Sequence, residues 1–65
     1  MPEIIYRVVL IFPDTISLAD FVFEIQIPGI ETSLREQSFS GCLTEEQVNR
    51  AVHQFGAYVR VCTPL

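Results

Sequence analysis

The chain has 65 residues, the length of one small domain, so we predict a single domain over residues 1–65. Hydrophobic residues make up 49% of it, which is too many for a disordered segment. Its 4 basic residues, all arginine, stand against 8 acidic ones, for a net charge of −4. This balance argues against a nucleic-acid partner and against an anionic membrane surface, because both need clustered Lys and Arg.

The first predicted element is a strand over residues 4–12, which are β-branched or aromatic at most positions and are followed by Pro13. Side chains two apart in a strand share a face. One face carries a single charge among aliphatic residues: Ile5, Arg7, Val9 and Ile11. The other face is uncharged: Tyr6, Val8, Leu10 and Phe12. We expect the uncharged set to face the core and the Arg7 set to face outward.

The next segment, up to Ile27, fits a turn that leads into a helix, and its second half also fits a strand. Four apolar residues recur at helical spacing: Leu18, Phe21, Val22 and Ile25. The stretch Phe21 to Ile27 also alternates well enough for a strand. Helix is favoured by an N-cap at Asp14 or Ser17 and by the break at Pro28-Gly29. The aromatic side chains of the segment are expected to pack in the core: Phe21 and Phe23.

Residues 30–36 and 37–43 alternate in hydrophobicity, which predicts two short strands joined by a turn near Glu36-Gln37. Gly41 lies inside the second of these strands. A glycine in a strand interior is typical of a bulge or of a close approach by other backbone or side-chain atoms.

Residues 44–56 carry the clearest helix pattern. Thr44 and Gln47 have the spacing of a capping box, and Gly56 stands where a left-handed C-terminal residue is expected. The apolar stripe between them comprises Val48, Ala51, Val52 and Phe55. Glu46 and Arg50 are spaced for an ion pair along the helix. A last strand over residues 57–63 follows directly.

The element order is strand, helix, strand, strand, helix, strand. This is the order of a split β-α-β, or ferredoxin-like, α+β fold, with two helices on one face of a four-stranded antiparallel sheet. In that topology the first and third strands form the middle pair, the fourth lies beside the first, and the second lies outside the third. The other face of the sheet is left uncovered.

The uncovered face holds the candidate functional residues. Three aliphatic residues on a water-facing strand predict an interface with a protein partner or a second copy: Ile5, Val9 and Ile11. Neighbouring arginines with hydroxyl groups nearby predict an alternative, a small anionic ligand: Arg7, Arg60, Ser40 and Tyr58. Alternation along the last strand places Cys62 on this face too.

Catalytic and metal chemistry have little support in the sequence. Cys42 and Cys62 do not form a C-x-x-C pair, and His53 is the single histidine, expected on the outer face of its helix. The strands of the two cysteines flank the first strand, which places them too far apart for a disulfide. We therefore predict a non-enzymatic cytoplasmic domain with free thiols, no metal and no cofactor. Self-association or protein binding is the expected function, and regulation by a small anionic metabolite is the alternative.

Overall fold

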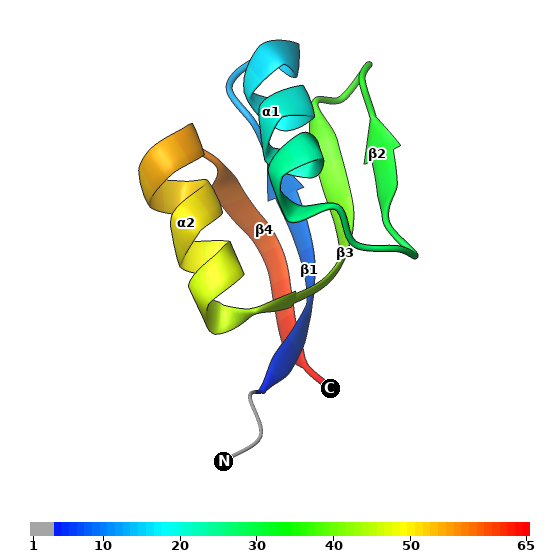
Figure 1. Cartoon of the computed structure of the whole chain (residues 1–65), viewed down its shortest axis with the longest axis vertical. Coiled ribbons are helices and arrows are strands. Elements are labelled where there is room, and N and C mark those ends of the chain that lie inside the picture. Colours follow the sequence, from blue (N-terminus) through cyan, green and yellow to red (C-terminus); the bar gives the residue numbers. More distant parts are fainter. Residues whose placement is uncertain (1–3) are drawn as a thin grey trace.

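A computed structural model describes residues 4–65. Its elements are β1 (Ile5–Ile11), α1 (Thr15–Ile25), β2 (Glu31–Ser33), β3 (Ser38–Thr44), α2 (Glu45–Phe55) and β4 (Tyr58–Pro64). The sheet order is β2-β3-β1-β4, and each neighbouring pair is antiparallel. Both helices cover the same face of the sheet (Figure 1). The predicted ferredoxin-like topology is confirmed.

The core lies between the sheet and the two helices. From β1 and the residue after it, the core takes the side chains predicted to face inward. Val8, Leu10 and Phe12 are fully or almost fully buried, and Tyr6 is partly buried against the core. Phe21 of α1 stands at the centre of an aromatic cluster. Its ring centroid lies 5.4 to 5.5 Å from the centroids of three other rings: Phe12, Phe39 and Phe55. Such tilted and edge-on contacts stabilise beyond the area they bury.

The segment that fitted both a helix and a strand is the helix α1, so the strand alternative for Phe21 to Ile27 is wrong. Asp14 is the N-cap, and its carboxylate accepts from the Ser17 amide at 2.7 Å. The hydrogen bond from the Ser17 amide is the largest effect that lowers the pKa of Asp14 below its usual value, because it favours the ionised carboxylate. The helix ends at Gln26, which adopts a left-handed conformation with φ 44°.

One core prediction for α1 is wrong. Phe21 is buried, but Phe23 is 75% exposed. The helical stripe that includes Leu18 and Phe21 is the side that packs on the sheet, and a residue two positions along a helix points to a different side. Phe23 therefore faces water although it has the same chemical character.

The predicted caps of α2 are confirmed. The Thr44 hydroxyl accepts from the Gln47 amide at 3.2 Å, and the Gln47 side-chain oxygen accepts from the Thr44 amide at 2.9 Å. Gly56 closes the helix with φ 71°. Arg50 does not bond Glu46 as expected; it pairs with Glu24 of α1 at 3.1 Å. Both side chains of that pair are substantially exposed, so it contributes little to stability.

Thr44→Ala is expected to lower the free energy of unfolding by about 1 kcal/mol, because it leaves the Gln47 amide without its cap. Gln47→Ala is the matched variant, since it removes only the reciprocal bond to the Thr44 amide. Urea unfolding followed by circular dichroism measures both. A Thr44→Ala domain as stable as wild type would show that the capping box does not stabilise the fold.

The second strand is shorter than predicted. It was expected to run to Glu36, but β2 ends at Ser33, and the next four residues form the turn. The Ser33 hydroxyl accepts from the Glu36 amide at 3.3 Å, and Gln37 is left-handed with φ 56°. Gly41 marks a close approach: a Cβ there would lie 3.0 Å from Cγ2 of Ile30.

The last strand contains a β-bulge that the alternation pattern did not predict. Leu10 pairs with Val59 and Val9 pairs with Val61, so Arg60 is the extra residue between them. The bulge shifts the alternation of every residue that follows it. The prediction that Cys62 shares the uncovered face is therefore wrong. Cys62 pairs with buried Val8 and belongs to the helix side, while Val61 joins the uncovered face.

Candidate functional site: the open sheet face

The candidate site is the sheet face opposite the helices, here called the open face. Cross-strand register arranges its side chains in rows, because paired residues point to the same side. One row is Glu31, Ser40, Val9 and Val61; the next is Cys42, Arg7 and Thr63. The row toward the other end is Ser33, Ser38, Ile11 and Tyr58. No described helix or strand covers these rows.

The open face is divided into a polar half and an apolar half. The side chains from β2 and β3 are mostly polar: Glu31, Ser33, Ser38, Ser40 and Cys42. Six apolar or aromatic side chains lie on β1, on β4 and directly after β4, and we call them the apolar strip: Ile5, Val9, Ile11, Tyr58, Val61 and Leu65. The Leu65 amide donates to the Ile5 carbonyl at 2.9 Å, which extends the pairing by one residue.

Several members of the apolar strip are well exposed. Tyr58 is 69% exposed, Val61 43% and Leu65 74%. Ile5 is also exposed, while Val9 and Ile11 are partly exposed between their neighbours. The predicted interface residues thus belong to a larger apolar set than the sequence indicated, and the polar row of Arg7 and Thr63 separates Ile5 and Leu65 from the other four members. Clustered exposed apolar side chains, such as those four, are typical of a binding site.

The structure brings together only part of the predicted anion site. Arg7 and Ser40 line an open depression of about 330 Å³ on the open face. Arg60 and Tyr58 do not line it. Arg60 is the extra residue of the bulge, and Tyr58 lies at the start of β4, in the row of Ile11. Glu31 lines the same depression, and its carboxylate repels an anion. The arrangement therefore favours an anionic ligand less than the sequence suggested.

The two edges of the sheet differ in how they are protected against pairing with another strand. The β2 edge has only 3 residues, whereas β4 has 7. The backbone amide of Leu65 points toward β1, so the backbone groups of the preceding residue, Pro64, point toward the outer edge. Proline has no amide hydrogen to donate to an added strand there. The bulge at Arg60 interrupts the same edge. Both features are typical protections of an edge strand, so partner binding by strand addition is disfavoured at β4.

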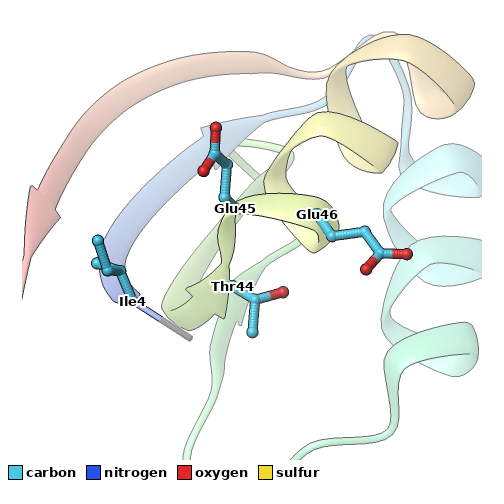
Figure 2. A pocket seen from close by; sticks show the side chains of 4 residues that line it. All are labelled: Ile4, Thr44, Glu45 and Glu46. Atoms are coloured by element: carbon cyan, nitrogen blue, oxygen red, sulfur yellow. The ribbon is translucent and has the colours of Figure 1, made fainter. Parts of the chain in front are cut away.

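A second depression, of about 280 Å³, lies at the start of α2 and is lined by Ile4, Thr44, Glu45 and Glu46. The carboxylates of Glu45 and Glu46 point away from each other (Figure 2). The Thr44 hydroxyl already accepts the capping hydrogen bond of the helix. No set of groups converges there on a common point, so this depression is not a candidate binding site.

The thiols and the histidine do not form a catalytic or metal centre within the described residues. Cys42 pairs with Arg7 and Cys62 with Val8, so their strands flank β1 as predicted. Both cysteines are free and exposed. His53 lies on the exposed side of α2. Among residues 4–65 there is no group of three His, Cys, Asp or Glu side chains placed to hold a metal ion.

Acidic residues are sparse on the open face. Among residues 4–65, Glu31 is the one acidic side chain that register places there. The other acidic residues lie in the helices, at a helix cap or in the turn after β2: Asp14, Asp20, Glu24, Glu36, Glu45 and Glu46. The net negative charge of the chain is thus concentrated away from the apolar strip.

Sequence reasoning missed Val61, Thr63 and Leu65 as members of this face. The bulge hides them, because strict alternation from Tyr58 assigns Val61 to the core side. The last strand by itself gives no signal that separates Val59 from Val61, because both are the same apolar residue and only the bulge places them on opposite faces.

Comparison of the chain with protein-family models, with curated protein sequences and with solved structures gave no match. None of the described helices is long and apolar enough to cross a membrane. Function must therefore be argued from the open face itself.

Proposed function

We propose that this domain is a non-enzymatic interaction module that binds a second copy of itself through the open face. The observation that supports this most directly is the apolar strip, which lies on two neighbouring strands and is left uncovered by the fold. Burying such a surface is favourable at roughly 25 cal/mol per Å². A chain of 65 residues also gains from association, because its own core is small.

The size of the strip sets the expected strength of binding. Two strands of 7 residues cover roughly 10 by 24 Å, or about 240 Å² in projection. Stable protein interfaces bury about 800 Å² on each partner. The dimer is therefore expected to be weak and to require a high protein concentration.

Val9→Glu is expected to abolish self-association and leave the domain folded. Val9 is a partly exposed member of the strip, so a carboxylate there stays hydrated in the monomer and is desolvated only in the dimer. The dissociation constant should rise about 100-fold or more, the factor for a loss of about 3 kcal/mol. Sedimentation equilibrium over a wide concentration range measures this change, and circular dichroism verifies the fold.

Phe23→Glu is the matched control. It introduces the same charge in place of an exposed apolar side chain, but on a helix at the opposite side of the molecule. It should dimerise as the wild type does. A wild type that stays monomeric at millimolar concentration would contradict the proposal, and so would a Val9→Glu variant with unchanged affinity.

Arg7 and Ser40 support a second, weaker candidate function, the binding of a small anionic metabolite in their depression. The guanidinium and the hydroxyl are suitable donors for such a ligand. Glu31 in the same depression opposes it, and Arg60 does not contribute. Self-association is thus the function that the geometry supports better.

A further inference from the structure

Resting on the proposed self-association, we infer how the two copies are oriented. The two-fold axis of the dimer runs parallel to the strands, over the boundary between β1 and β4. Each copy then places its β1 against β4 of the other, in the same row of the sheet. Val9 lies over Val61 of the second copy, and Arg7 lies over Thr63 of the second copy.

The residue classes of the two strands support this orientation, because they match row by row. Apolar Ile5 is beside Leu65, Val9 is beside Val61, and Ile11 is beside the aromatic Tyr58. The single polar row pairs Arg7 with Thr63. An interface between identical surfaces must be complementary to itself. A two-fold axis along this boundary exchanges the two strands within each row, so it superposes apolar rows on apolar rows and the polar row on the polar row.

Other positions of the axis bring unfavourable groups together. An axis directly over β1 would place Arg7 against Arg7 of the second copy, and like charges at close range repel. An axis across the strands at Val9 would reverse the rows and press Arg7 onto Ile11, at the desolvation cost of an unpaired charge. An axis over β3 would place the apolar strip against the polar half of the face. At the β1–β4 boundary, Arg7 instead meets the Thr63 hydroxyl, a hydrogen-bond acceptor.

The charge distribution supports a second copy as the occupant of this face. Two chains of net charge −4 repel unless they meet where acidic groups are sparse. Among residues 4–65, the open face holds Glu31 as its one acidic group, and register places it on β2, two strands away from β1. The β1–β4 half is therefore the surface at which two copies approach with the least repulsion.

Distances between spin labels test the orientation. In a chain whose native thiols are replaced, Cys42→Ser and Cys62→Ser, single labels are placed by Ile4→Cys or Leu34→Cys; both sites are exposed and lie off the apolar strip. The proposed axis keeps the two β1 strands parallel. The Ile4 labels should then lie within roughly 15 Å, from sheet and strand spacings of about 10 and 4.8 Å. The Leu34 labels should be roughly 25 Å or more apart, because β2 lies far from the axis.

Each outcome decides between orientations. Ile4 labels about 30 Å or more apart in a dimer would mean reversed rows and would overturn the inference. Close Leu34 labels would place the axis over β3 and overturn it as well. Absence of any dimer in the unlabelled wild type is the separate result that contradicts the proposed function.

Discussion

Val8→Glu is expected to unfold the domain. Val8 is 0% exposed in the middle of β1, where it faces the helices. A carboxylate at this position would lose its hydration without gaining a partner, since no buried charged side chain lies among residues 4–65. The cost is several kcal/mol, and domains of this length have about 3–10 kcal/mol of stability in total. Loss of the cooperative unfolding transition in circular dichroism is the measurement.

Val9→Glu is the matched control for that result, since it makes the same chemical change one residue away on the opposite face of the same strand. It should unfold cooperatively near the wild-type midpoint. If Val9→Glu unfolds the chain and Val8→Glu does not, the two faces of β1 have been assigned the wrong way round.

The fold could be predicted from sequence where local signals agree with one another. The α2 helix has a cap, an apolar stripe and a terminal glycine that all indicate the same boundaries, and the structure has them. The faces of β1 were predicted because one alternating set contains Arg7, which fixes that set on the outside. Element order then left few topologies to consider.

The open face could be predicted only in part, because which residues of β4 it contains depends on the β-bulge in the pairing of β4 with β1. The bulge at Arg60 belongs to the pairing of β4 with β1, and neither strand alone carries a signal for it. As a result, Val61 was missed, Cys62 was assigned to the wrong side, and Arg60 was placed beside Arg7. Phe23 shows the same limit in a helix, since hydrophobicity alone does not say which aromatic residue faces the core.

The aromatic contacts of this small core converge on Phe21. Its side chain is fully buried, and its ring contacts the rings of Phe12 from the segment after β1, Phe39 from β3 and Phe55 from α2. It therefore joins both helices to the two central strands. Removing it leaves a cavity bordered by three aromatic rings, and closely packed surroundings of this kind fill such a space only in part.

Phe21→Ala is accordingly expected to lower the free energy of unfolding by about 3–5 kcal/mol, a large share of the stability available to a domain of this length. Phe23→Ala, two residues along the same helix and 75% exposed, should change it by less than about 0.5 kcal/mol. Urea unfolding of both variants measures the difference. Equal effects of the two substitutions would contradict the placement of α1 against the sheet, because that placement buries the ring of Phe21 and leaves the ring of Phe23 in water.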